Sequence, residues 1–335
     1  MTLTYSPEFG MALGGLWCVL AFIWLRALSP TVKARWMHLL HALLPVAALA
    51  GYYGLPASAP LVPFLGQWLQ AGAVTLAFLT LVWLYTLRTR NSSVMDVVYT
   101  PSAWLPVLVV AWASGPLTQR TLLVLGLMLV WSLRLIRHAS RTNLGERGEQ
   151  QPYASWRLKF GASWWWWSFF QVFTLQGGLV WVWIMPAVFV VSLPASAWGP
   201  LDMAGVAIWL LGLVFQAGAD WQLERFKADP ANQGKVLQTG LWSLSRHPNY
   251  FGETLMWWGL FVLSLHHPYA WLGLAGPVYV TWFMSRGSAA AMLDRHMLRS
   301  KPDYADYVRR VPGFCPLYKS PLDEKLLARA ANAGR

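Results

Sequence analysis

The sequence contains little charge and almost no cysteine. Charged residues make up 12% of its 335 residues, whereas 56% are hydrophobic and 23 are tryptophan. A soluble domain does not combine so few charges with repeated apolar runs long enough to cross a bilayer, so the composition predicts a membrane protein with several spans. The two cysteines, Cys18 and Cys315, are too few and too far apart for a disulfide framework or a metal site.

The usual signatures of nucleotide and metal sites are also missing. The sequence has no glycine-rich fingerprint after a strand, no phosphate-binding loop and no His/Cys cluster at metal-ligand spacing. Any nucleotide is therefore expected to bind without a Rossmann domain, and no metal is expected. The net charge of +12 does not indicate nucleic acid, because the basic residues lie between apolar runs and not along one soluble face. No obligate protein partner is inferred either.

Nine apolar runs predict an all-α bundle of about nine transmembrane helices. The first run has no basic segment before it and is too long for a signal-peptide core, so we expect a retained helix. The runs are Phe9–Leu28, Met37–Gly54, Leu61–Leu87, Val94–Ala113, Leu117–Ile136, Trp164–Leu193, Leu201–Ala219, Tyr250–Leu265 and Tyr269–Ser285.

Basic and uncharged loops alternate along the chain. Lysine and arginine gather in every second loop and in the tail from Arg286, whereas the N-terminus and the loops near Ala57, Ser114, Ala195 and His267 carry neither. The positive-inside rule then places the N-terminus outside and the C-terminus in the cytoplasm, as an odd number of spans requires. The inner loops hold most of the polar side chains, so a functional site is expected to open to the cytoplasm.

The first polar constellation is Asn91–Tyr99, at the inner start of the fourth run. Asp96 lies about one turn into the apolar segment, and Tyr99 follows three residues later on the same helical face. A carboxyl group at that depth is a candidate functional residue. The alternative is a helix N-terminal acid that pairs with Arg88 or Arg90.

Two further constellations follow the fifth and seventh runs. In Trp131–Arg147, Arg141 recurs at helical spacing with two earlier basic residues and precedes a polar turn that contains Asn143. These side chains could bind ligand phosphate or equally lipid phosphate. In Gly218–Lys235, the charged residues Asp220, Glu224 and Lys227 follow one another at three- and four-residue spacing on one helical face. They are candidate site residues, and the alternative is that they form a salt-bridge ladder at the helix end.

The densest constellation is Gly240–Gly259. Pro248 favours a helix start, and a helix N-terminus beside basic residues offers amide donors and a positive dipole end to an anion. The alternative is a hydrated turn whose charges meet lipid headgroups. Its candidate residues are Arg246, His247, Asn249, Tyr250 and Glu253, with Arg286 as a downstream partner.

Three segments together resemble the steroid 5-alpha-reductase family, and in particular its bacterial branch, whose substrates are mostly undetermined. They are SRHPNYFGE, the upstream DWQLERFK, and the tail DRHMLRSKPDYADYVRRVPGFCP. The similarity covers Asn91–Leu317, which makes 1–90 a transmembrane extension, 91–317 the reductase-like core and 318–335 a cytosolic tail. The RHPxY element alone is also similar to isoprenylcysteine-type membrane methyltransferases.

The resemblance implies an NADPH-dependent reductase that acts on a C=C bond conjugated to a carbonyl in a lipid-soluble substrate, in the bacterial inner membrane. It implies a seven-helix core that closes over the cofactor from the cytosolic side. The cofactor-site residues implied or proposed are Arg141, Asn143, Asp220, Lys227, Arg246, His247, Asn249, Tyr250, Glu253 and Arg286.

Asp96 occupies the place of the family glutamate that polarises the substrate carbonyl. The family's tyrosine partner would fall near Trp131 and Ser132, so Tyr99 is the substitute proposed. Burial should keep the Asp96 carboxyl protonated and able to donate to the carbonyl oxygen, with the nicotinamide between Asp96 and Glu253.

Two other functions stay open. An S-adenosylmethionine-dependent membrane methyltransferase would need no 2′-phosphate site and no Asp96 donor. A lipid transporter or scaffold would spread its buried polar residues along a continuous pore, and would not gather them at the cytosolic end.

Overall fold

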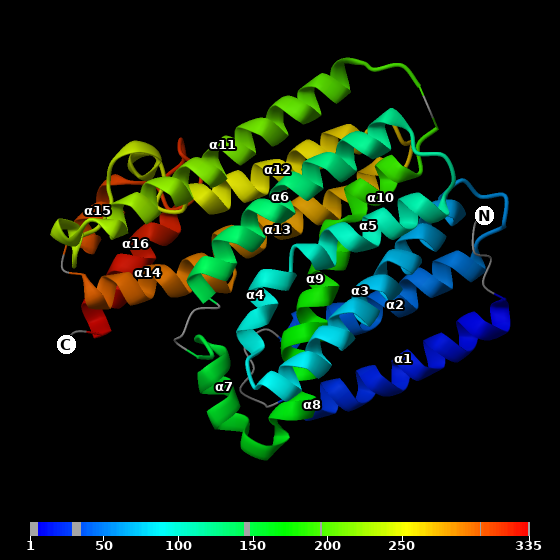
Figure 1. Cartoon of the computed structure of the whole chain (residues 1–335), viewed down its shortest axis with the longest axis horizontal. Coiled ribbons are helices and arrows are strands. Elements are labelled where there is room, and N and C mark those ends of the chain that lie inside the picture. The colour runs from blue at the N-terminus through cyan, green and yellow to red at the C-terminus, as the bar shows by residue number, and fades with distance from the viewer. Residues whose placement is uncertain (1–5, 29–34, 144–147, 195, 302, 334–335) are drawn as a thin grey trace. The chain divides into compact units, whose positions relative to one another are not determined.

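The computed structural model describes residues 6–28, 35–143, 148–194, 196–301 and 303–333, in which helices are joined by turns and loops (Figure 1). The described residues contain no strand, so the predicted all-α class without a Rossmann sheet is confirmed. The chain divides into two compact units, Met1–Ser196 and Ala197–Arg335. The boundary between the two units, at Ser196 and Ala197, falls inside the predicted reductase-like core of 91–317. The predicted division of the chain at residues 90 and 317 stays a prediction.

The N-terminal unit is built around α3. Its residues Phe64, Trp68, Ala71, Thr75 and Leu79 are buried at spacings of three and four, so one stripe of the helix packs against its neighbours. The unit contains α1 (Pro7–Ala27), α2 (Arg35–Gly54), α3 (Leu61–Thr89), η1 (Ser92–Val94), α4 (Met95–Val98), α5 (Pro101–Ala113), α6 (Gln119–Asn143), α7 (Tyr153–Phe160), η2 (Gly161–Ser163), α8 (Trp164–Ser168), the π-helix η3 (Phe169–Thr174), α9 (Leu175–Trp183) and α10 (Met185–Val191).

Two tryptophans join α3 to α9. Trp68 Nε1 donates to the Trp181 carbonyl over 2.9 Å, and Trp181 Nε1 donates to the Trp68 carbonyl over 2.6 Å. Their rings stack with centroids 4.2 Å apart. Both tryptophan side chains are buried, and each indole N–H has a hydrogen-bond acceptor. The pair therefore fixes the position of α3 against α9.

The C-terminal unit is organised by the antiparallel pair of α11 and α12. The unit contains α11 (Pro200–Ala228), η4 (Pro230–Asn232), η5 (Gly240–Ser243), α12 (Pro248–Ser264), η6 (Ala270–Leu274), α13 (Ala275–Arg286), α14 (Ser288–Ser300), α15 (Tyr304–Arg310) and α16 (Pro321–Ala333).

Glycines bring α11 and α12 into backbone contact at two levels. A Cβ on Gly212 would lie 2.6 Å from the Gly252 carbonyl oxygen, and one on Gly259 would lie 2.7 Å from the Gly205 carbonyl oxygen. The glycines are seven residues apart on both helices, so the same face is small at successive levels. No side chain fits between the two helices there, which fixes their register.

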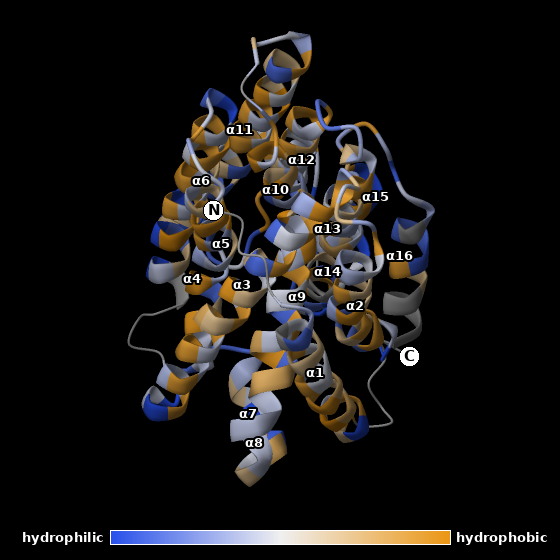
Figure 2. Cartoon of the chain, turned by 90° about the vertical axis from the view of Figure 1, so that its right-hand side faces the viewer, coloured by the Kyte–Doolittle hydropathy of each residue, from blue (hydrophilic) through white to orange (hydrophobic). Residues whose placement is uncertain are grey.

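Length and composition allow four helices of the described residues to cross a membrane, or six if each bent pair counts as one span. Hydrophobic residues run along the long helices (Figure 2). The predicted count of nine is not confirmed, partly because α12 and α13 have only 17 and 12 residues.

Two of the runs predicted as spans are bent in the structure. The run Val94–Ala113 bends by 51° between η1–α4 and α5, and the run Trp164–Leu193 by 50° before α10. Pro101 and Pro186 lie in the first turn of the helix after each bend. Because proline lacks an N–H and clashes with the preceding turn, it begins a new helix more readily than it continues one.

Candidate active site

In the N-terminal unit, Asp96 pairs with a tyrosine that lies far along the chain. Asp96 is in the first turn of α4 and is half-buried, whereas Tyr153, the first residue of α7, is buried. Tyr153 Oη donates to Asp96 Oδ1 over 2.6 Å across a separation of 57 residues. An oxygen of the Asp96 carboxyl can accept this bond whether the carboxyl is ionised or protonated, because both forms keep acceptor capacity.

Tyr99, the tyrosine proposed as partner of Asp96, packs edge-on against Trp131. The ring centroids are 5.9 Å apart at 87°. The acid–tyrosine hydrogen bond that the structure shows is thus Asp96–Tyr153, and the sequence interpretation did not consider Tyr153. The sequence feature that could have indicated Tyr153 is its position at the first residue after the polar loop between α6 and α7.

An ion pair fixes the loop that carries Tyr153. Arg157 donates to both oxygens of Glu149, from Nε over 2.7 Å and from Nη2 over 2.8 Å. Glu149 Oε1 also accepts from the Ser92 N–H over 2.7 Å, and the Gln150 N–H donates to Ser93 Oγ over 2.6 Å. Since η1 leads directly into α4, this clamp holds the loop against the helix of Asp96.

The Glu149 carboxyl is acidic. Its partial burial alone would raise its pKa, but the hydrogen bonds from Arg157 and Ser92 and the charge of Arg157 together lower the pKa below the ordinary glutamate value. Glu149 is therefore ionised at neutral pH, and the clamp is a charged one.

In the C-terminal unit, Arg246 is enclosed by the tail of the chain. Its guanidinium donates to Asp323 Oδ1 over 2.7 Å, to Asp294 Oδ2 over 3.0 Å and to the Val311 carbonyl over 2.8 Å. The residue is 2% exposed. Two carboxylates neutralise this arginine, so in this structure it does not present its charge to a phosphate; its proposed role as a phosphate ligand stays a prediction.

Asp294 is the centre of this Arg246 cluster, which comprises Arg246, His247, Asp294, Tyr304 and Asp323. His247 Nε2 lies 2.9 Å from Asp294 Oδ1, and Tyr304 Oη donates to the same oxygen over 2.5 Å. Burial would raise the pKa of Asp294, but the contact with His247 and the charge of Arg246 hold that pKa well below its ordinary value. Neither Asp294 nor Asp323 was among the predicted site residues.

A second set of polar contacts joins α11 to α12 next to the glycine contacts. Gln216 Nε2 donates to Glu253 Oε2, and Trp257 Nε1 donates to Glu253 Oε1 over 2.9 Å. One turn away, Asn249 Nδ2 donates to Asp220 Oδ1 over 2.9 Å. We call these contacts the amide–acid ladder. It unites three predicted cofactor residues, Asp220, Asn249 and Glu253.

The ladder offers groups of the kind that bind a nucleotide. Glu253 is buried, whereas Asn249 is half-buried in the first turn of α12. Tyr250 stacks on His247 with ring centroids 5.4 Å apart at 7°. The donor set therefore fits the uncharged part of a dinucleotide, while the phosphates need cations other than the neutralised Arg246.

The other predicted cofactor residues lie at helix ends. Arg141 is exposed in the last turn of α6, Lys227 in the last turn of α11 and Arg286 at the end of α13. Asn143 ends α6, but its side chain lies outside what the structure describes. Asp96, Tyr99, Arg141 and Asn143 belong to the N-terminal unit and the remaining candidates to the C-terminal unit. The proposed nicotinamide position between Asp96 and Glu253 stays a prediction.

Comparison with known proteins gives one family match and two partial similarities. A family model described as "Protein of unknown function (DUF1295)" matches residues 82–311. The chain is 33% identical to a Delta(14)-sterol reductase of Ascobolus immersus over 104 residues, which cover 26% of this chain and 24% of the relative. It is 32% identical to a probable O-methyltransferase, ustE, of Ustilaginoidea virens over 93 residues, or 28% and 32% of the two chains. The chain thus spans about a quarter to a third of the length of these relatives.

Proposed function

Since this chain belongs to the DUF1295 family, within the steroid 5-alpha-reductase-like superfamily, we propose that it is an NADPH-dependent membrane reductase. Its substrate would be a lipid-soluble molecule with a C=C bond conjugated to a carbonyl. The observation that carries the proposal is the Asp96–Tyr153 hydrogen bond at the bent start of a membrane segment. The similarity to a Delta(14)-sterol reductase supports it.

A bound NADPH would supply the hydride for the β-carbon of the enone, so negative charge would develop on the substrate carbonyl oxygen. Protonated Asp96 donates its proton to that oxygen and forms an enol, which then returns to the ketone by solvent proton exchange. The Tyr153 hydroxyl stabilises the Asp96 carboxylate left behind and holds its orientation. A preorganised donor of this kind acts most strongly where water is excluded.

The test compares the two tyrosines near Asp96, with purified protein in nanodiscs and a 3-oxo-Δ4 steroid as enone substrate. We expect Asp96→Leu to lower turnover on the order of 10²-fold or more, and Asp96→Asn to lower it less because an amide keeps some donor capacity. Tyr153→Phe should cost about tenfold. Tyr99→Phe is the matched control, because it also loses one hydroxyl yet leaves the Asp96–Tyr153 bond intact. Wild-type turnover in both Asp96→Leu and Tyr153→Phe would refute the mechanism.

We propose that the nucleotide binds at the amide–acid ladder. Asn249 and Asp220 would contact the nicotinamide amide or a ribose hydroxyl, and the buried Glu253 would support them from the interior. The assignment of Arg141, Asn143, Lys227, Arg246, His247, Tyr250 and Arg286 to the same site stays a prediction from the sequence. Asn249→Ala and Glu253→Ala should each weaken NADPH binding by about 1–3 kcal/mol in calorimetry. Glu253→Gln serves as the control for folding, since it keeps the shape and one acceptor. Unchanged NADPH affinity in both alanine variants would exclude this site.

The alternative function is an S-adenosylmethionine-dependent methyltransferase, which the similarity to a probable O-methyltransferase favours. Titration of the same protein with NADPH, NADH and S-adenosylmethionine separates the two functions. The reductase requires NADPH to bind more tightly than NADH, because only NADPH carries the 2′-phosphate. Binding of S-adenosylmethionine alone would replace the reductase proposal.

We further propose that the protein lies in a bacterial inner membrane with its N-terminus outside and its C-terminus in the cytoplasm, as the alternating basic loops indicate. Lys319 is exposed in the tail, so Lys319→Cys can be tested with Cys18 and Cys315 replaced by serine. Membrane-impermeant reagents should label this position only after the cells are opened. Labelling of intact cells would reverse the assignment.

A further inference from the structure

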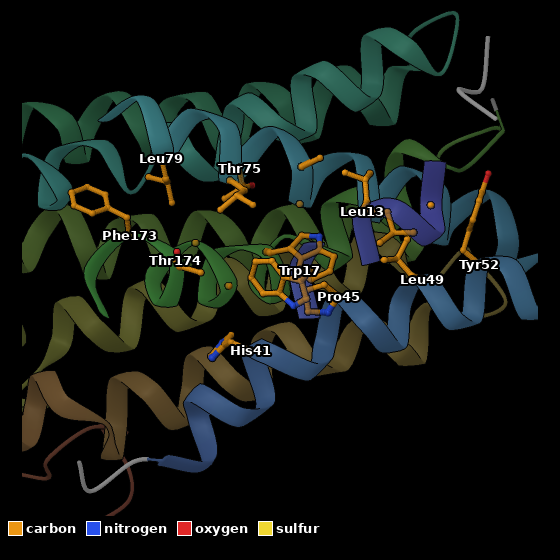
Figure 3. Close-up of a pocket in the computed structure, with 18 of the residues that line it drawn as sticks. Leu13, Trp17, His41, Pro45, Leu49, Tyr52, Thr75, Leu79, Phe173 and Thr174 are labelled. Carbon is orange, nitrogen blue, oxygen red and sulfur yellow. The ribbon is translucent and has the colours of Figure 1, made fainter. Parts of the chain in front are cut away.

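The N-terminal unit contains a cavity that the proposed reduction does not use. It has a volume of about 430 Å³, is lined by α1, α2, α3 and the stretch from η3 to α9, and is partly open to the outside (Figure 3). Figure 3 shows Phe173 toward one end and Tyr52 toward the other, with Trp17 and Pro45 between them. This volume is within the range of about 300–1,000 Å³ that is usual for small-molecule sites.

The cavity lies mostly outside the part of the chain that the family match covers. That match begins at residue 82, whereas α1, α2 and most of α3 precede it; only the wall from Phe173 to Trp181 lies inside. The cavity is thus a property of the N-terminal extension of this chain, closed by one segment of the family region.

The chemistry of the walls excludes a charged ligand. No lysine, arginine, aspartate or glutamate is among the described residues that line the cavity. The lining is mainly leucine, glycine and aromatic residues, and the lining residues Leu13 and Ala73 are exposed. A charged headgroup would lose its hydration there without compensation, so the fitting ligand is uncharged.

Close contacts between the surrounding helices show that the cavity does not come from loose packing. A Cβ on Gly178 of α9 would lie 2.5 Å from His41 Cδ2 of α2, and one on Gly177 would lie 2.8 Å from Leu79 Cδ1 of α3. α9 is therefore in close contact with both α2 and α3 beside the empty space. A cavity between helices that already touch cannot close by a small shift of one helix.

One wall presents a hydroxyl group without a partner. Thr174 ends the π-helix η3 and is only 6% exposed, yet its Oγ1 has no hydrogen-bond partner among the described residues. Thr75, on the opposite wall, differs: its hydroxyl donates to the Ala71 carbonyl of its own helix over 2.9 Å. In the π-turn the Phe170 carbonyl, four residues before Thr174, accepts instead from the Leu175 N–H.

A buried hydroxyl without a partner is unfavourable, so it marks a place where a ligand group or water completes the structure. From the cavity, its uncharged walls and this hydroxyl, we propose that the extension binds an uncharged lipid with an apolar body and a single hydroxyl or carbonyl group. The body fills the cavity, and its polar group exchanges a hydrogen bond with Thr174. The lipid enters from the bilayer.

The test uses the full-length protein in nanodiscs without NADPH and a photoreactive sterol that carries one hydroxyl. Labelled peptides are identified by mass spectrometry, and affinity is taken from competition with the unlabelled sterol. We expect saturable labelling of peptides from α2, α3 and α9. Ala73→Trp and Leu76→Trp, which fill the cavity from α3, should each reduce labelling at least tenfold.

The hydroxyl contact is tested by Thr174→Val, which keeps the side-chain shape. It should weaken sterol binding about three- to tenfold and leave the binding of the matched deoxy-sterol unchanged. Thr80→Val is the control, because the Thr80 hydroxyl donates to the Leu76 carbonyl of its own helix and lies outside the cavity. A photoreactive phospholipid provides the competing charged lipid.

Three results would overturn the inference: labelling that survives both tryptophan variants, equal labelling by the phospholipid, or equal loss in Thr174→Val and Thr80→Val. Thermal unfolding of each variant shows whether lost labelling reflects lost folding. The labelling result is taken from the tryptophan variant that keeps the wild-type melting temperature. Binding is measured without turnover, so failure of the proposed reductase activity leaves this result standing.

Discussion

The Arg246 cluster and the Asp96–Tyr153 pair are both polar sites next to apolar helices, yet they differ in burial and in how their charge is neutralised. Arg246 is shared between Asp294, Asp323 and a carbonyl, and the whole group is buried. Asp96 is half-buried and accepts a hydrogen bond from Tyr153, whose loop the Glu149–Arg157 ion pair holds.

This difference indicates different roles. A charge that the protein itself neutralises on several sides stabilises the fold but has little left for a ligand. A carboxyl group at a partly open position can exchange its proton with a substrate. In the C-terminal unit, the density of charged residues around Arg246 thus reflects the attachment of the tail, and the ladder at Asn249 is the part that stays accessible.

The largest expected effect is on stability, from Arg246→Met. The substitution leaves two buried carboxylates without their cation, which should cost about 3–5 kcal/mol of unfolding free energy. Arg309→Met is the control, because Arg309 forms an ion pair with Asp306 at the surface and should cost less than about 1 kcal/mol. Thermal unfolding in detergent measures both.

Equal stability of the two arginine variants would break the comparison. A third variant sharpens it: Arg246→Met combined with Asp294→Leu and Asp323→Leu removes all three charges. That variant should regain much of the lost stability, because no uncompensated charge remains buried.

The next effect concerns the contact that supports the amide–acid ladder. A Cβ on Gly252 would lie 2.5 Å from the Gly212 carbonyl oxygen, so Gly252→Leu must separate α11 from α12. We expect a loss of about 1–3 kcal/mol or more, together with weaker NADPH binding. Gly126→Leu on α6 is the control, since nothing lies within 4 Å of its added Cβ. Equal stability of the two variants would argue against the backbone contact.

A smaller effect is expected from pH. The folded-state pKa of Asp294 is depressed, so its contribution to stability is present above the unfolded pKa of about 3.9 and is lost as pH falls toward the folded value. Unfolding free energy should be flat from pH 7 to 5 with respect to this group and fall by about 1 kcal/mol from pH 5 to 3. Asp294→Asn should remove this fall, whereas exposed Asp306→Asn should not. An unchanged profile in Asp294→Asn would contradict the assignment.

The smallest effect is expected at the clamp beside Asp96. Glu149→Gln keeps the shape but removes the charge that Arg157 meets, so the loop of Tyr153 should become less well positioned. We expect a two- to fivefold lower turnover with unchanged NADPH affinity, on the order of 0.5–1 kcal/mol. A loss as large as that of Asp96→Leu would mean that Glu149 takes part in the chemistry directly.

Much of the helical framework was predictable because hydrophobic length is a local property. The run Leu61–Leu87 corresponds to α3 at Leu61–Thr89, and Leu201–Ala219 lies within α11 at Pro200–Ala228. The bends could not be read from hydropathy, since the apolar runs continue through Pro101 and Pro186. Hydropathy shows that a segment is apolar. The helix axis changes just before Pro101 and Pro186, which lie in the first turns of α5 and α10.

The candidate site was predictable in part. Depth in an apolar run singled out Asp96, and helical spacing placed Asn249 and Glu253 on one face, where the structure shows them in contact with Asp220 and Gln216. Tyr153 was missed because it lies 57 residues from Asp96, and Asp323 because it lies 77 residues from Arg246.

The sequence by itself determined the membrane-embedded helical class, the inventory of ionisable groups and the small faces that let α11 approach α12. Only the tertiary structure decided which acid meets which donor and that α1, α2, α3 and α9 leave a cavity between them. The physical reason is range: burial and helix propensity act along a few consecutive residues, whereas a hydrogen bond requires two groups within about 3 Å, and only the folded chain brings distant residues that close.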